Sequence, residues 1–289
     1  MTYELYTAAQ NAVKGHSGRG RSYWEVAANC GYQRYLTDLR KHVEAGEEPD
    51  WARRGVYYHF LQEQWHRGSL HGAIELFPSD TCWKEAVTLF DWYRRTYTTT
   101  TFGTPVGIEE QFPVTDEDKQ RVAEWFGIPP EYCPTARFDM RTNISESQVI
   151  ELATNHGILL PGAGTYVIDF KHGGAHFGDD AVKFSVGPQA ILYMTMAQKF
   201  IDSSCRGVIF NKVSMTREKG ALTLKPTSFR TYTTAFRPEY AGRARSMIRY
   251  AYQSLISKSK NGFVCGDCPF YKETNVHGPC DGINGESNE

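Results

Sequence analysis

An aspartate and a lysine lie two residues apart at the end of an apolar stretch, in the sequence TYVIDFKHGG. Side chains alternate along a β-strand, so Asp169 and Lys171 would point to the same face. The carboxylate can hold a hard divalent cation, while the lysine can orient a water molecule or neutralise charge on a phosphate. This pattern is typical of a hydrolytic metal centre. The alternative is a simple ion pair at the end of a strand.

A second candidate carboxylate, Asp139, lies in the alternating sequence TARFDMRT. Considered alone, it is expected to form a surface ion pair with Arg137 or Arg141. Considered with Asp169, it would complete a pair of carboxylates that converge on Mg²⁺ or Mn²⁺. Two such carboxylates support in-line attack of water on a phosphodiester.

Two further pairs of residues have the spacing of one helical turn. Gly55 and His59 lie four residues apart, as do Gln189 and Tyr193, so each pair shares a helix face. A glycine lets another part of the chain approach the helix, and a histidine can bind a metal. The alternatives are a packed or surface histidine, and a surface glutamine beside a core tyrosine.

The motifs of several other enzyme classes are absent. The chain has no GxxxxGK[ST], GxSxG, HExxH or GxGxxG sequence, which disfavours phosphate-loop NTPases, nucleophile-elbow hydrolases and common zinc proteases.

The formal net charge is −1, so nucleic-acid binding would depend on a local basic patch. One candidate patch is the segment 237–260, where basic residues are interleaved with tyrosines. A solvated helix face is the alternative there.

The sequence also bears on membranes and cellular location. No apolar run reaches the roughly 18 residues that a membrane span requires. The first 20 residues contain no apolar core of a signal peptide. We therefore expect a cytoplasmic protein that has no contact with a membrane.

The spacing of apolar residues predicts helices and strands in a mixed order. Expected helices cover residues 22–42, 53–67, 80–97, 116–126, 188–201 and 237–260, with a weak helix or an insertion at 145–156. Expected strands cover residues 105–114, 135–142, 165–171, 207–215 and 221–231. This order predicts an α/β fold with a mixed sheet and an N-terminal helical subdomain.

In chain order, the segments RRGVYYH, EEQFPV, ARFDMR, YVIDFKHGG and QAILYM resemble the PD-(D/E)XK nuclease superfamily. The match is closest to its RecB-like branch, which includes the RecB and AddB nuclease domains, phage recombination exonucleases and the CRISPR adaptation nuclease. The resemblance covers residues 22–268 and implies a mixed-sheet nuclease core flanked by helices, with a cysteine-bearing C-terminal tail. Two departures are Ala136, where the family often has glycine, and the longer stretch 143–163, which would be a DNA-contacting insertion or a lid.

The resemblance also implies roles for individual residues. The metal ligands implied by the family pattern are His59, Asp139, Asp169 and the carbonyl group of Phe170. The catalytic lysine would be Lys171, acting beside the two aspartates. The residues that would support the DNA backbone and the site are Gln189, Tyr193 and Glu110, the last at an acidic position that often precedes the aspartate strand.

Three of the seven cysteines lie within sixteen residues, at Cys265, Cys268 and Cys280. The CxxC spacing predicts a tetrahedral metal site or an iron–sulfur cluster. The fourth ligand could be His277, which completes a local zinc set, or the distant Cys30. In the resembling relatives, one N-terminal cysteine joins three C-terminal ones around a 4Fe–4S cluster, so the resemblance favours Cys30. The remaining cysteines are expected to be small buried residues: Cys82, Cys133 and Cys205.

Together these features predict a Mg²⁺- or Mn²⁺-dependent exodeoxyribonuclease that acts on single-stranded DNA or duplex ends. Its setting would be recombination, repair or CRISPR adaptation in a bacterial, archaeal or phage-infected cytoplasm, with recombination or CRISPR proteins as partners. The expected domains are a loose arm at residues 1–20, the nuclease domain at 21–262 and a cysteine segment at 263–289. The alternatives are a DNA-binding module with a residual nuclease site and a zinc-stabilised interaction protein.

Overall fold

The computed structural model of the 289-residue chain describes Trp24, Ala27 and residues 50–70, 72–173, 177–216 and 225–257. Trp24 and Ala27 are helical and buried, inside the helix expected at 22–42. The rest of that helix, Cys30 and the three C-terminal cysteines lie outside the described residues. So do both expected domain boundaries. No helix in the described ranges is long and apolar enough to cross a membrane.

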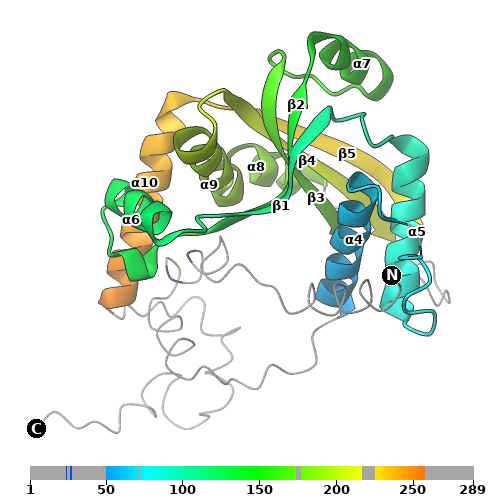
Figure 1. Cartoon of the computed structure of the whole chain (residues 1–289), viewed down its shortest axis with the longest axis horizontal. Coiled ribbons are helices and arrows are strands. Elements are labelled where there is room, and N and C mark those ends of the chain that lie inside the picture. Colours follow the sequence, from blue (N-terminus) through cyan, green and yellow to red (C-terminus); the bar gives the residue numbers. More distant parts are fainter. Residues whose placement is uncertain are drawn as a thin grey trace, which may run out of the picture. The chain divides into compact units, whose positions relative to one another are not determined.

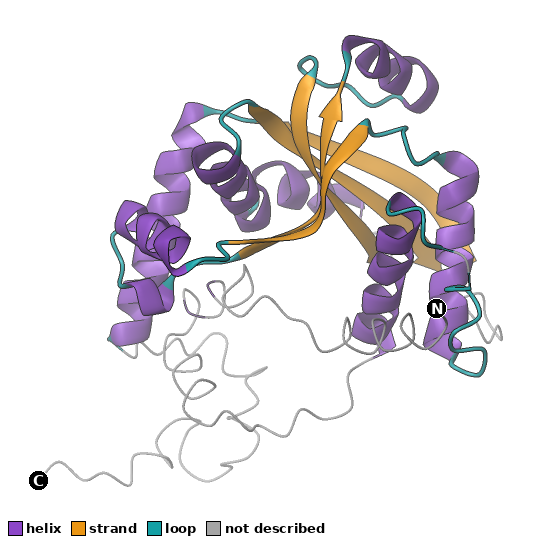
Figure 2. Ribbon diagram, viewed as in Figure 1, coloured by secondary structure: helices purple, strands orange, loops and turns teal. Residues whose placement is uncertain are grey.

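A five-stranded sheet forms the centre of the fold, with its strands in chain order (Figures 1 and 2). The strands are β1 (Thr104–Phe112), β2 (Ala136–Ile144), β3 (Gly164–Gly173), β4 (Cys205–Thr216) and β5 (Lys225–Ala235). Strands β3 and β4 are parallel, and the other neighbouring pairs are antiparallel. The prediction of an α/β fold with a mixed sheet is therefore confirmed.

Two helices, α4 (Asp50–His66) and α5 (Thr81–Thr96), pack against each other and cover one face of the sheet (Figure 1). The side chain of Asp80 accepts hydrogen bonds from the backbone N–H groups of Cys82 and Trp83, so it caps α5 as its position predicts. The buried core on this face combines helix residues such as Phe90 with sheet residues such as Ile168.

The parallel pairing of β3 and β4 requires a crossover connection, which consists of α8 (Phe177–Val186) and α9 (Pro188–Met196). Helix α9 begins at the proline predicted to start it and continues into a π-helical turn, Ala197–Ile201. Both helices lie on the other face of the sheet, where Tyr193 packs against Phe138 and Phe184 stacks on Phe210 (Figure 1). Because β3 and β4 are covered on both faces, most of their residues are buried, including polar ones such as Asp169 and Asn211.

The sequence did not predict α8. Its ten residues follow the HGG segment, which reads as a turn. Helices this short are marginal without tertiary packing, and Phe184 supplies that packing against β4. The 145–156 segment, expected as a weak helix or an insertion, is helix α7 (Glu146–His156), which begins with a capping box formed by Ser145 and Gln148.

The chain divides into two compact units, of which the second contains Thr115–Pro134 and the chain from Arg245 onward. Helix α6 (Asp116–Phe126) has the predicted bounds, with Thr115 as its N-cap. The guanidinium Nε of Arg249, in α10 (Pro238–Ile256), donates a 2.7 Å hydrogen bond to the carbonyl oxygen of Phe126. This bond joins the two helical segments of the unit. Cys82, Cys133 and Cys205 are buried, as expected.

Candidate metal centre

The antiparallel pairing of β2 with β3 ends at Met140 and Ile168, one position before the two candidate aspartates. Continuing that register would place Asp139 opposite Asp169. Beyond this point β2 still pairs with β1, so β2 and β3 separate where the aspartates lie. The backbone N–H of Phe170 donates a 2.6 Å hydrogen bond to Oδ2 of Asp139 instead of to a ladder partner. The fold therefore brings the two carboxylates together where a sheet opens.

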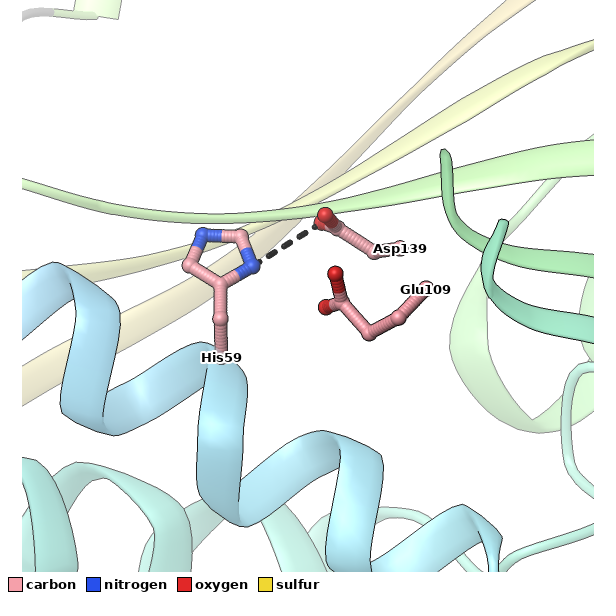
Figure 3. Close-up of side chains that lie close together, drawn as sticks. All are labelled: His59, Glu109 and Asp139. Atoms are coloured by element: carbon pink, nitrogen blue, oxygen red, sulfur yellow. Dashed lines mark ion pairs between the residues drawn. The ribbon is translucent and has the colours of Figure 1, made fainter. Parts of the chain in front are cut away.

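Three side chains from three elements converge at this opening: His59 from α4, Glu109 from β1 and Asp139 from β2 (Figure 3). Each offers one ligand atom, and these atoms lie within 4.8 Å of one another. Nδ1 of His59 is 3.1 Å from Oδ2 of Asp139. An imidazole nitrogen and two carboxylates form a donor set that suits a divalent cation such as Mn²⁺. The residues present therefore fit a divalent metal ion.

Glu109 enters this group through an unusual backbone conformation. Its φ angle is 52°, the only positive value among non-glycine residues in the described part of the chain. Left-handed backbone costs about 1 kcal/mol or more in an ordinary residue. Nε of Arg137 lies 2.5 Å from Oε2 of Glu109 and helps to hold the side chain in place. The cost of the conformation is consistent with a functional role for this carboxylate.

Glu110, which the family pattern implies as a supporting residue, is not one of the three converging side chains. Its two carboxylate oxygens accept hydrogen bonds from Nε and Nη2 of Arg141, at 2.9 and 3.1 Å. Neighbouring residues of a regular strand point to opposite faces, so one of the two glutamates had to face away. The strand sequence EEQF carries no signal that distinguishes the two glutamates. In the structure, Glu109 has the positive φ angle and is the glutamate that reaches His59 and Asp139.

Burial and charge act against each other in this group. Burial raises the pKa of Glu109 to about 7, and the negative charge of Asp139 adds to this effect. Burial alone would raise the pKa of Asp139 and lower that of His59, but their ion pair outweighs burial, so the pKa of Asp139 is lowered and that of His59 is raised. Without a metal, the pair therefore favours the protonated form of His59 and the ionised form of Asp139. A bound cation would replace the His59 proton as the positive charge beside Asp139.

Asp169 and Lys171 lie on the same strand face, as their spacing predicts, and Nζ of Lys171 pairs with Oδ2 of Asp169. Asp169 is 1 % exposed. Burial raises its pKa to about 6, against the opposing effect of the Lys171 charge. A buried carboxylate held beside an ammonium group is typical of a functional site.

The residues one turn apart on α9 connect this site to two strands. Nε2 of Gln189 donates a 3.1 Å hydrogen bond to Oδ1 of Asp169 in β3. The hydroxyl of Tyr193 donates a 2.8 Å hydrogen bond to the carbonyl oxygen of Arg137 in β2. Helix α9 therefore holds β2 and β3 in place on the two sides of the opening.

Gly55 lies one turn before His59, and a residue from β3 explains why a side chain is absent there. A Cβ atom at Gly55 would overlap Nε2 of His172, the residue that follows Lys171. Burial lowers the pKa of His172 to about 3, and the nearby positive charges of His59, Arg54, Lys171 and Lys212 add to this effect. The imidazole of His172 is thus a neutral spacer between α4 and the end of β3.

Three comparisons with known proteins bear on this chain. No protein-family model matches it, and no curated protein sequence is significantly similar to it. A crystal structure of a candidate exonuclease from Eubacterium rectale is similar in structure, with a TM-score of 0.46 and 12% sequence identity. The alignment covers 96% of this chain and 94% of that one.

Proposed function

We propose that this protein is a metal-dependent nuclease that hydrolyses phosphodiester bonds in DNA. The observation that carries this proposal is the convergence of His59, Glu109 and Asp139 at the sheet opening, beside the buried Asp169 and its partner Lys171. A site that only stabilised the fold would not need a glutamate in a strained conformation or a carboxylate buried with a raised pKa.

The residues of the site divide into two groups. His59, Glu109 and Asp139 would hold a divalent cation, with Asp169 at its border. When bound, such a cation polarises a phosphate and lowers the pKa of a water molecule. Lys171 carries a positive charge that can neutralise a phosphate oxygen or orient the attacking water, and Asp169 directs its ammonium group. Gln189 fixes the second oxygen of Asp169, so the carboxylate cannot rotate freely.

The finer assignment rests on the sequence resemblance. It supports exonucleolytic cleavage of single-stranded DNA or duplex ends, a role in recombination, repair or CRISPR adaptation with partner proteins of that pathway, and a cytoplasmic location. The 4Fe–4S cluster on Cys30, Cys265, Cys268 and Cys280 belongs to the same proposal, with zinc as the alternative metal. Those cysteines lie outside the described residues, so the support is their spacing in the sequence.

The test is a cleavage assay with end-labelled single-stranded and duplex oligonucleotides in Mg²⁺ or Mn²⁺, and with closed circular DNA. We expect cleavage of the linear substrates, loss of cleavage in EDTA, and no cleavage of circles if the enzyme is an exonuclease.

Asp169→Asn and Lys171→Ala should each lower the rate by at least about 100-fold, because they remove a charge that acts on the transition state. A matched control is Asp116→Asn, at a carboxylate that is exposed on α6. Wild-type rates in the Asp169 and Lys171 variants would exclude the proposed site, and inactivity of the wild-type protein with every metal and substrate would exclude the nuclease.

A further inference from the structure

A second lysine lies beside Lys171 on the neighbouring strand. The parallel pairing of β3 with β4 places Lys212 directly opposite Lys171. Paired residues on adjacent strands point to the same face of a sheet and lie about 5 Å apart. Lys212 therefore shares a face and a position with the proposed catalytic lysine, although 41 residues separate the two in the sequence.

Lys212 is 5 % exposed, and its Nζ pairs with Oδ2 of Asp180, a residue of α8 that is 6 % exposed. Burying an ion pair has a large desolvation cost, and an apolar pair of similar size is often equally or more stable. The two preceding positions on the same face of β4, Val208 and Phe210, are apolar, and both side chains are buried. Stability alone therefore gives little reason for a buried lysine at this position.

The surroundings of Lys212 suit an anion that lies next to Lys171. Gly173 of β3 lies beside the end of the Lys212 side chain, and an added Cβ there would lie 3.6 Å from Cε and 3.9 Å from Nζ of Lys212. The glycine therefore places no side chain between the ammonium group and the β3 backbone. Each lysine is matched by an aspartate, Lys171 by Asp169 and Lys212 by Asp180. A phosphodiester and a divalent cation would add opposite charges to this balanced group.

We infer that Lys212 is a second phosphate-binding lysine, which contacts the nucleic-acid backbone beside Lys171 and is oriented by Asp180. The inference rests on the proposed nuclease function and extends it to the recognition of the substrate. Its ligand is the phosphodiester backbone, which is common to all sequences, so Lys212 would contribute affinity without base specificity.

The main test is the double variant Lys212→Met with Asp180→Asn, which removes both charges and leaves no buried charge without a partner. We would compare kcat, KM and the salt dependence of kcat/KM with those of the wild-type protein, on a single-stranded oligonucleotide with saturating Mn²⁺. Loss of a charged hydrogen bond should lower kcat/KM about tenfold or more. Loss of one phosphate contact should also make the slope of log(kcat/KM) against log[salt] shallower by about 0.7 to 1. An unchanged slope would overturn the inference, because an ion pair that only anchors α8 would lower activity without altering the slope.

Asp180→Asn alone provides the matched control, and Lys212→Gln with Asp180→Asn repeats the test if the first double variant does not fold. The single variant removes the same ion pair but keeps the ammonium group, so it should retain the wild-type salt slope. A slope that falls as it does in the double variant would instead assign the effect to the ion pair, and the inference would be wrong.

Binding of the oligonucleotide in EDTA, followed by fluorescence anisotropy, separates this inference from the nuclease proposal. If the wild-type protein binds DNA but never cleaves it, the nuclease proposal fails. The salt slope of binding then still tests Lys212, with the same expected difference between the wild-type protein and the double variant.

Discussion

The backbone N–H of Phe170 donates a 2.6 Å hydrogen bond to Oδ2 of Asp139, the same oxygen that lies 3.1 Å from Nδ1 of His59. One carboxylate oxygen thus connects β2 to both β3 and α4. The bond occurs at the position where the ladder between β2 and β3 has ended. It satisfies a backbone donor that would otherwise lack its strand partner, and it fixes the orientation of a proposed metal ligand.

The two adjacent glutamates of β1 allow a direct test of the site. Glu109→Gln should lower metal affinity and cleavage by about tenfold or more, because it removes one charged donor from the group around His59 and Asp139. Glu110→Gln weakens a pair with Arg141 and should have a much smaller effect. The measurement is the cleavage rate as a function of Mn²⁺ concentration in both variants. A larger loss in the Glu110 variant would contradict the assignment of Glu109 as a metal ligand.

The raised pKa of Glu109 predicts a pH dependence of stability in the metal-free protein. Its pKa is about 7 in the folded chain and lower when unfolded, so the folded state binds more protons between these values. The free energy of unfolding in EDTA should therefore fall as the pH rises from about 4.5 to 7 because of this group. Glu109→Gln should remove that contribution and be more stable than the wild-type protein at pH 8.

Thermal unfolding in EDTA between pH 5 and 8 measures this difference. The lowered pKa of Asp139 acts in the opposite direction, since its contribution to stability is lost as the pH falls through the folded-state pKa. The wild-type protein and the Glu109→Gln variant share Asp139, so this opposing contribution is present in both proteins. Adding Mn²⁺ should raise the melting temperature of the wild-type protein more at pH 8 than at pH 5, because metal ligands must lose their protons. A pH-independent difference between the two proteins would contradict the assigned pKa.

Gly55→Ala should reduce activity although alanine favours helices. The new methyl group would overlap Nε2 of His172 and displace the end of β3. The control is Gly242→Ala in α10, where an added Cβ meets nothing within 4 Å. It should gain up to about 1 kcal/mol of stability from helix propensity. The measurements are the melting temperature and kcat/KM of both variants. If Gly55→Ala is fully active and gains as much stability as Gly242→Ala, α4 tolerates the methyl group and the prediction is wrong.

The cysteine prediction depends on a residue far from the others in sequence. Cys30→Ala should remove the visible absorbance of an iron–sulfur cluster from protein purified without oxygen, and it should lower the melting temperature. His277→Ala should do neither. Metal analysis of both variants is the measurement: zinc retained in Cys30→Ala, together with no iron in the wild-type protein, would favour the local zinc site.

Local signals in the sequence were sufficient for most of the secondary structure. The cap at Asp80 and the bounds of α6 followed from residues within a few positions of each helix end. The strand that contains Asp169 and Lys171 followed from alternation, which also placed both residues on one face. The α/β class followed from the order of these elements. Helix α8 was missed because its stability comes from packing on the sheet, which no local pattern encodes.

The sequence by itself determined which residue types are available for metal and phosphate chemistry, and on which elements they lie. Only the tertiary structure decided which of them meet. The end of the β2–β3 ladder brings Asp139 close to Phe170, a positive φ selects Glu109 over Glu110, and the parallel register sets Lys212 beside Lys171. Each of these outcomes depends on strand pairing or on a backbone angle that long-range packing imposes. Local sequence patterns report propensity and periodicity, so they carry no information about such pairings.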